Sequence, residues 1–269
     1  MSEPFEPFVM RDLEYIPGLT LDVYRPDDDV ATLRPSLLFL HGGSFHGGDK
    51  ADARSVAFCT ALAAAGYAMV SANYSLGSGP GRDERWDAWP QSLLDCRAAL
   101  EFIWGEQYRI GADSRLVGAM GVSAGATMAL VLGLVSDDEL AEIAFEGGLV
   151  PEHSVTPAVR VVVNLYGRVD FANDTVPERR PTSDERTRLI SPLTYVTPGK
   201  RLPFLLTIHG TDDEIVPFSQ ARLLHDAIVD VDEDHELWRM HGAGHDFGTS
   251  VNGHELPSRI VGYLQRVFA

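Results

Sequence analysis

The chain has 269 residues, of which 45% are hydrophobic and 23% are charged, and its formal net charge at pH 7 is −17. This composition is typical of a globular protein with a sizeable core. The negative charge argues against nucleic acid and membrane surfaces as partners, because anionic partners of this kind bind to basic surfaces. Every apolar stretch is also shorter than the roughly 20 residues needed to cross a bilayer.

The N-terminus and the cysteines indicate the compartment. The first 15 residues are acidic and lack the basic and apolar regions of a secretory signal. Cys59 and Cys96 both lie in apolar, helix-like segments, which favours two buried thiols in a reducing compartment over a disulfide framework. We therefore expect a cytoplasmic protein.

Short apolar runs alternate with helical patterns along most of the chain. The first two runs, 10–16 and 19–26, flank Pro17-Gly18 and predict an antiparallel hairpin at one edge of a sheet. Most later runs are continuously apolar, as expected for strands covered on both faces. These runs are 36–40, 67–74, 116–120, 159–166, 204–209 and 236–240. Helical patterns cover about 51–65, 89–105, 124–135, 218–230 and 256–268. The alternation predicts an α/β fold with a mostly parallel central sheet and helices on both faces.

Two segments, 136–157 and 168–198, do not fit this alternation. Neither could bury a core of its own, so we expect residues 1–269 to form a single domain with both segments as excursions from the sheet. Ligands of open α/β sheets bind beyond the carboxyl ends of the strands. The two excursions are therefore predicted to lie over that crevice.

The sequence GVSAG, at 121–125, stands where a buried strand is predicted to become a helix. Small residues could serve only the packing of a tight turn, but Gly-x-Ser-x-Gly is also typical of a strained turn that presents a serine nucleophile. The segments HGTDDEIVP (209–217) and HGAGHDF (241–247) follow two later strands. A serine, an acid and a histidine in this chain order are expected of an α/β-hydrolase.

The chain resembles the α/β-hydrolase superfamily over roughly residues 20–269, through HGGSF, NYSL, WPQSLLDCRAALEFI, GVSAG, HGTDDEIVP and GAGH. More narrowly, it is similar to the esterases with an HGG motif, which include hormone-sensitive-lipase-like carboxylesterases, feruloyl and acetyl-xylan esterases, and kynurenine formamidases. Lipase-like members usually have a third glycine, where this chain has Ser44, and a longer N-terminal cap. These departures favour the shorter, more open esterases.

The expected catalytic residues are Ser123, Asp213 and His245. Ser123 is the nucleophile and His245 the base that accepts its proton, because a serine hydroxyl is a poor nucleophile unaided. Asp213 orients the imidazole and stabilises its cation. Asp212 and Glu214 are competing acids, but the position in the motif favours Asp213.

Backbone N–H groups of Gly43, Ser44 and Ala124 are the expected oxyanion hole, since the attacked carbonyl becomes an oxyanion that needs such donors. Phe45 and Trp86 are candidate substrate contacts.

Most of the other histidines are expected either to brace loops or to lie at the surface. His41 and His209 each open an HG turn and are expected to brace loops by hydrogen bonding. His241 and His245 are four residues apart, but the Gly-Ala-Gly between them argues against a helical pair of metal ligands. We expect no metal and no cofactor. Five histidines without an evident partner are expected at the surface, namely His46, His153, His225, His235 and His254.

The sequence thus predicts a serine carboxylesterase that hydrolyses short-acyl, water-soluble esters through an acyl-enzyme, because the excursions lack the broad apolar face of a lipid-facing lid. The expected partner is a small-molecule ester, and a homodimer is a candidate assembly. An arylformamidase-type amide hydrolase and an acyltransferase use the same machinery and are alternatives. A non-catalytic binding protein on the same scaffold is a further alternative.

Overall fold

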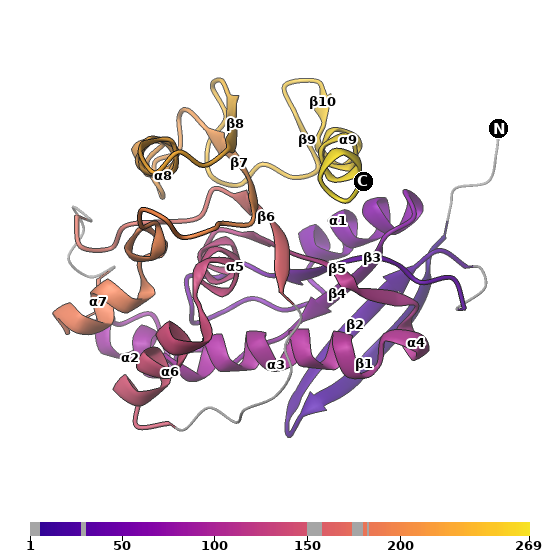
Figure 1. The fold of residues 1–269 in the computed structure, drawn as a ribbon, viewed down its shortest axis with the longest axis horizontal. Helices are drawn as coiled ribbons and strands as arrows, with labels where there is room; N and C mark the ends of the chain where they lie inside the picture. Colours follow the sequence, from indigo (N-terminus) through magenta and orange to yellow (C-terminus); the bar gives the residue numbers. More distant parts are fainter. Residues whose placement is uncertain (1–5, 28–30, 150–157, 174–179, 182) are drawn as a thin grey trace.

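A computed structural model describes residues 6–27, 31–149, 158–173, 180–181 and 183–269 (Figure 1). An eight-stranded sheet in the order β1-β2-β4-β3-β5-β6-β7-β8 runs through the molecule. Its strands are β1 (Phe8–Ile16), β2 (Leu19–Arg25), β3 (Arg34–Leu40), β4 (Ala68–Ala72), β5 (Ala112–Val122), β6 (Val159–Leu165), β7 (Phe204–Gly210) and β8 (His235–Met240). β1 and β2 form an antiparallel hairpin at one edge, and β2 is also antiparallel to β4. All pairs from β4 to β8 are parallel, so the predicted sheet is confirmed.

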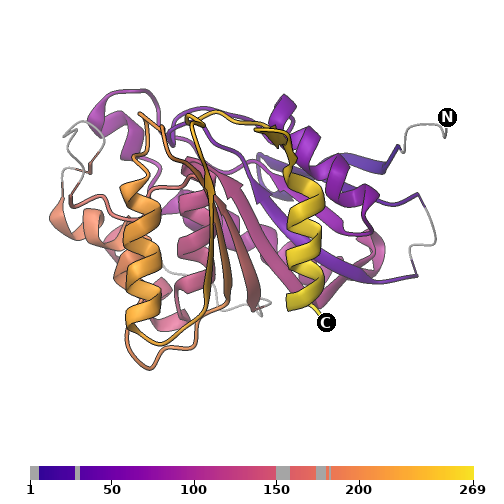
Figure 2. The same cartoon turned by 90° about the horizontal axis from the view of Figure 1, so that it is seen from above.

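The inner strands are buried on both faces, which explains their continuously apolar sequences. All five residues of β4 and the last five of β3 are buried. The helices that bury them are α1 (Ala53–Ala64), α3 (Gln91–Gly105), α5 (Ala124–Leu134), α8 (Ser219–Asp230) and α9 (Leu256–Val267). α1 and α9 contribute to one apolar core, whereas α3, α5 and α8 contribute to the core on the other face. Figure 2 shows α8 and α9 on opposite sides of the sheet.

Several short elements were not expected from the sequence. They are α2 (Arg82–Trp86), α4 (Gln107–Ile110), α6 (Asp137–Glu146), α7 (Asp184–Ile190), the 3₁₀ helix η2 (Pro192–Tyr195), and the small strand pair β9 (Ser250–Val251) and β10 (His254–Glu255). No helix within the described residues is both long and apolar enough to cross a bilayer. Cys59 and Cys96 are both buried, free thiols.

The two predicted excursions contain α6, α7 and η2, and parts of them, 150–157, 174–179 and 182, lie outside the described residues. Asp137 and Leu140 of α6 line a cleft together with Val159 and Phe204, which begin β6 and β7. The described start of the first excursion thus lies near the amino ends of these strands. The second excursion leaves the carboxyl end of β6, where the residues described next are found.

Candidate active site

Ser123 lies in the sharp turn between β5 and α5. Its backbone has φ 52° and ψ −120°, a left-handed conformation that is strained for a residue with a side chain. The Ser123 N–H donates to the Leu165 carbonyl of β6 at 3.0 Å, which holds the turn against the neighbouring strand. A Cβ built on Gly125 would lie 2.2 Å from the Leu40 carbonyl oxygen. Packing therefore explains the glycine at 125, but not the serine hydroxyl at 123.

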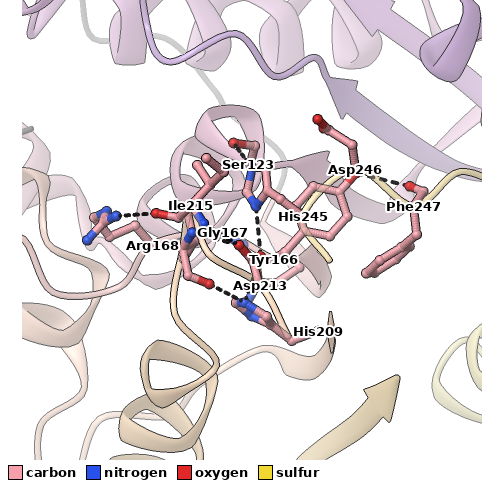
Figure 3. Close-up of polar contacts among 12 residues, drawn as sticks. Ser123, Tyr166, Gly167, Arg168, His209, Asp213, Ile215, His245, Asp246 and Phe247 are labelled. Carbon is pink, nitrogen blue, oxygen red and sulfur yellow. Dashed lines mark hydrogen bonds and ion pairs between the residues drawn. The ribbon is translucent and has the colours of Figure 1, made fainter. Parts of the chain in front are cut away.

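Ser123, His245 and Asp213 form one hydrogen-bonded line, although they are far apart in the chain (Figure 3). The Ser123 Oγ lies 2.9 Å from the His245 Nε2. The His245 Nδ1 lies 2.7 Å from the Asp213 Oδ2. Each side chain comes from a segment that follows the carboxyl end of a parallel strand, β5, β7 or β8.

The Asp213 carboxylate is fully buried and is surrounded by donors. Its Oδ1 accepts from the N–H groups of Ile215 at 2.9 Å and Val216 at 2.8 Å. Its Oδ2 contacts His245 and also lies 3.2 Å from the Nε2 of the fully buried His209. Burial alone would raise the pKa of Asp213, but the hydrogen bonds from His209, His245 and Val216 outweigh it and hold that pKa well below its ordinary value. Asp213 is therefore ionised over the whole range in which proteins normally work.

Asp213 differs from the two other candidate acids, Asp212 and Glu214, in its burial and in its hydrogen bonds. Asp212 and Glu214 are exposed, and among the described residues the Asp212 carboxylate accepts only from the adjacent Thr211 hydroxyl. The His209 Nε2 also lies 2.8 Å from the Val216 carbonyl oxygen. Because a carbonyl only accepts, this nitrogen carries the proton, and His209 braces the loop that holds Asp213.

The His245 ring packs against Tyr166, a residue that the sequence reasoning missed. The two ring centroids are 4.8 Å apart in an edge-on arrangement, and Phe247 packs on the same tyrosine at 4.6 Å. Asp246 pairs with Arg54 of α1 at 3.3 Å, which ties the histidine loop to a helix. Tyr166 directly follows β6, at the edge of the sheet where the other site residues gather. That position was the signal that could have identified it.

The HGG loop follows β3 and adopts an unusual backbone. Gly43, Ser44 and Phe45 all have positive φ, at 126°, 55° and 66°. A Cβ built on Gly42 would lie 3.4 Å from the Ser123 Cβ, so this loop lies directly against the serine.

The donors expected of an oxyanion hole lie in this region. Within the described residues, no hydrogen bond uses the backbone N–H of Gly43, Ser44 or Ala124. His41 braces the start of the loop, as expected, since its Nδ1 contacts the Gly42 carbonyl oxygen at 2.7 Å and its ring stacks on Tyr74.

A cavity of about 50 Å³ opens beside the Ser123 hydroxyl. Three aromatic rings form much of its wall. Phe45 and Trp86 are 4.7 Å apart between ring centroids, and Trp86 and Phe171 are 5.5 Å apart. Phe45 and Trp86 therefore lie where a substrate contact would be, whereas Phe171 was not identified from the sequence.

Other side chains in the wall come from α2, from α5 and from the segments after β6 and β7. They are Arg85, Thr127, Arg168, Ile215 and Val216, in addition to Ser44, Ser123 and Ala124. Arg168 and Phe171 belong to the second excursion, which thus reaches the carboxyl edge of the sheet. Among the described residues, no group of three or more histidines, cysteines or carboxylates is arranged to hold a metal ion.

His225 and His235 are half-buried and are hydrogen-bonded, so the expectation of surface positions without a partner does not hold for them. Their Nδ1 atoms are 3.1 Å apart, and the His235 Nε2 lies 2.8 Å from the Thr207 hydroxyl. Burial, together with the neighbouring His225, lowers the pKa of His235 to about 3. His254 is exposed and His46 is half-buried, whereas His153 lies outside the described residues.

A mostly parallel sheet with an antiparallel N-terminal pair, and a serine on the sharp turn after a central strand, define the α/β-hydrolase fold. The BD-FAE family model matches residues 21–228, and the chain belongs to this family.

The relatives that the chain matches in sequence are named as esterases or ester hydrolases. Esterase LipC of Mycobacterium tuberculosis is 29% identical over 247 residues, which cover 86% of this chain and 57% of LipC. The probable carboxylic ester hydrolase LipM of the same organism is 26% identical over 78% of this chain and 48% of its own length. The chain thus spans about half the length of these relatives.

Two solved structures share the fold. A truncated carbohydrate esterase from gut microbiota superposes with a TM-score of 0.80 at 18% identity, covering 100% of this chain and 98% of that one. The apo form of Thermogutta terrifontis esterase 2 gives a TM-score of 0.72 at 20% identity, covering 99% and 94%.

Proposed function

We propose that the protein is a serine carboxylesterase that uses Ser123, His245 and Asp213 as its catalytic triad. The observation that carries the proposal is the unbroken line of hydrogen bonds from the Ser123 hydroxyl through the His245 imidazole to the Asp213 carboxylate. The relatives named above as esterases and as a carboxylic ester hydrolase support the same reaction class. The buried, free thiols are consistent with a cytoplasmic location.

In the proposed reaction, the Ser123 Oγ attacks the ester carbonyl carbon while His245 Nε2 accepts the hydroxyl proton. The carbonyl oxygen becomes an oxyanion, and the N–H groups of Gly43, Ser44 and Ala124 stabilise it. Each such donor typically contributes about 10²- to 10³-fold to turnover. His245 then gives its proton to the leaving alcohol, which leaves the acyl group on Ser123. A water molecule, activated by His245, releases the acid and restores the serine.

The cavity beside Ser123 receives the acyl side of the substrate. Its wall contains Ser123 and the oxyanion-hole residues Ser44 and Ala124, but His245 does not line it. Because His245 must reach the leaving oxygen to protonate it, the alcohol part lies on the histidine side. A cavity of about 50 Å³ has room for roughly three to five water-sized groups. We therefore propose short acyl groups.

Labelling with a fluorophosphonate probe tests the triad, since such probes modify activated serines. Thermogutta terrifontis esterase 2, which shares this fold, has been solved in a form phosphonylated by cyclosarin. Ser123→Ala should abolish labelling and hydrolysis of 4-nitrophenyl acetate, whereas Ser44→Ala should still be labelled. Undiminished labelling of Ser123→Ala would refute the assignment.

The acyl-length preference has its own test. Turnover across 4-nitrophenyl esters from acetate to dodecanoate should be greatest at four carbons or fewer. A maximum at twelve carbons would refute the short-acyl proposal.

The same small cavity also accommodates a formyl group, which keeps an arylformamidase as a second candidate. Comparing kcat/KM for N-formylkynurenine and phenyl acetate separates the two. A value for the formamide well above that for the ester would favour the amide hydrolase.

A further inference from the structure

Two histidines contact the same oxygen of the Asp213 carboxylate. The Oδ2 atom lies 2.7 Å from the His245 Nδ1 and 3.2 Å from the His209 Nε2. The other oxygen, Oδ1, already accepts from the backbone N–H groups of Ile215 and Val216. The side chains of Asp213 and His209 are both fully buried, so water does not compete for these contacts. The charge of Oδ2 is therefore divided between two imidazoles, of which one belongs to the proposed catalytic base.

The contacts of His209 fix which of its two ring nitrogens carries the proton. Its Nε2 lies 2.8 Å from the Val216 carbonyl oxygen, which can only accept. The same N–H is also near Oδ2 and is shared between the two oxygens in the manner of a three-centre hydrogen bond. The Nδ1 of His209 is buried and has no partner among the described residues. A proton there would be a buried donor without an acceptor, so His209 acts as a neutral donor with a fixed tautomer.

Other titratable and charged groups surround the His245 imidazole, but they contact it or its loop at different atoms. Tyr166, which follows β6, packs edge-on against the ring. The remaining groups are Asp246 with its partner Arg54 of α1, Arg168 at the Ile215 carbonyl, and the exposed Asp212 and Glu214. Among the described residues, His209 and His245 are the side chains that contact Oδ2 of Asp213. A change at His209 therefore acts on His245 through this oxygen.

We propose that His209 is a positioning residue that tunes the basicity of His245 by taking up part of the charge on Asp213. The carboxylate stabilises the imidazolium that forms when the seryl proton is transferred. Because the His209 N–H withdraws part of the charge from Oδ2, this stabilisation is weaker than an undivided carboxylate would give. His245 therefore remains a free base, able to accept the proton of Ser123, at a lower pH than it would without His209. This inference rests on the proposed esterase function, since it concerns the base of that reaction.

The pH dependence of kcat/KM measures this effect, because its acid limb reports the ionisation of the base in the free enzyme. The substrate is 4-nitrophenyl acetate, read at the wavelength where nitrophenol and nitrophenolate absorb equally. His209→Leu removes the N–H that contacts Oδ2, so the whole charge of that oxygen faces His245. We expect the acid limb to move to higher pH by about 0.5–1 unit, as for the loss of one weak hydrogen bond. The plateau of kcat/KM should stay within about tenfold of the unmodified value.

Two further variants separate the N–H group of His209 from the packing of its ring. A glutamine amide can place an N–H where the His209 Nε2 lies, so His209→Gln should leave the acid limb in its original position. Phe218→Leu is the matched packing control, because the Phe218 ring packs edge-on against His209, with 5.8 Å between the ring centroids, and cannot donate to Asp213. Its acid limb should also stay in place.

The outcomes separate this inference from the proposed function. An acid limb that stays in place or moves to lower pH in folded His209→Leu, with the ester still hydrolysed, would overturn the inference alone. An equal displacement in His209→Gln or Phe218→Leu would also overturn it, because the N–H would then not be the cause. Complete inactivity of folded His209→Leu would do the same, since shared charge predicts only a modest change.

The fold of the His209 variants is checked by urea unfolding. If His209→Leu does not fold, His209→Asn takes its place, because the shorter amide cannot bring an N–H to Oδ2, and the same displacement of the acid limb is expected. If the unmodified protein does not hydrolyse the ester at any pH, the esterase proposal itself is refuted.

Discussion

Replacing Asp213 with asparagine should almost abolish turnover while leaving the fold intact. The carboxylate has two acceptor oxygens, of which one receives the N–H groups of Ile215 and Val216 and the other faces His245. An asparagine side chain has one acceptor oxygen and one NH₂ donor. Its two orientations therefore have different consequences.

The hydrogen bonds decide which orientation prevails. If the NH₂ group faced the backbone, two buried N–H groups would lose their acceptor, at about 1–3 kcal/mol each. The opposite orientation keeps both of these bonds, loses only the 3.2 Å contact with the protonated His209 Nε2, and places the NH₂ group against the His245 Nδ1. That nitrogen must then accept, so the proton moves to Nε2, where it faces the Ser123 hydroxyl. The base can no longer accept the seryl proton, and the same change in such a triad lowers kcat by about 10⁴-fold.

Steady-state hydrolysis of 4-nitrophenyl acetate measures the loss, and urea unfolding measures stability. The control is Asp212→Asn, because Asp212 is the adjacent, exposed carboxylate, and its kcat should stay within about twofold of the unmodified value. If Asp213→Asn keeps more than a hundredth of the activity, the tautomer argument is wrong. If Asp212→Asn is the inactive variant, the acid has been misassigned.

Three further predictions follow from the packing and the titrating groups. Gly125→Ala should lower the free energy of unfolding in urea by at least about 2 kcal/mol, because the alanine Cβ would lie 2.2 Å from the Leu40 carbonyl oxygen. Unchanged stability would show that the turn can move. Trp86→Ala removes one aromatic ring from the cavity wall, so the 4-nitrophenyl ester with the highest turnover should have a longer acyl chain than in the unmodified protein. An unchanged optimum would show that the acyl chain does not bind in this cavity. Burial lowers the pKa of His235 to about 3 in the folded protein, whereas the unfolded chain keeps the ordinary histidine pKa. When the pH falls below that ordinary value, the unfolded chain binds more protons than the folded protein. The free energy of unfolding is therefore greatest above that pH and decreases as the pH drops towards 3. The fall between pH 7 and 5 should be about 2 kcal/mol and should be smaller in His235→Gln, whereas equal falls would contradict the assignment.

The long elements could be predicted because their apolar patterns are continuous. VRVVVNLY, at 159–166, leaves no alternative to a buried strand, and the structure forms β6 there. The five-residue α2 and four-residue α4 are too short to show a helical period, so only packing defines them. α6 could have been found, because the Ser136 hydroxyl and the Glu139 carboxylate cap its start in the manner of a capping box.

The site likewise contains residues that could be predicted from the sequence and residues that could not. Ser123, Asp213 and His245 follow strands of one parallel sheet, so their meeting at its carboxyl edge was predictable from their order in the chain. Arg168 and Phe171 belong to an irregular segment after β6, whose path depends on contacts such as the Phe171 N–H donating to the Ser191 hydroxyl. The His225–His235 pair likewise depends on how α8 packs beside β8. Periodicity carries no information about such contacts.

The lack of space between Gly125 and the end of β3 has a consequence for redesign and for divergence among related chains. The turn that carries Ser123 and the loop that begins at His41 are in backbone contact, so neither can be exchanged for a foreign loop without the other. New acyl selectivity is therefore more accessible through α2 and the segment after β6, which supply Trp86, Arg168 and Phe171 from separate parts of the chain. Substrate choice can thus diversify by changes in these peripheral segments while the turn and the loop are inherited together as one unit.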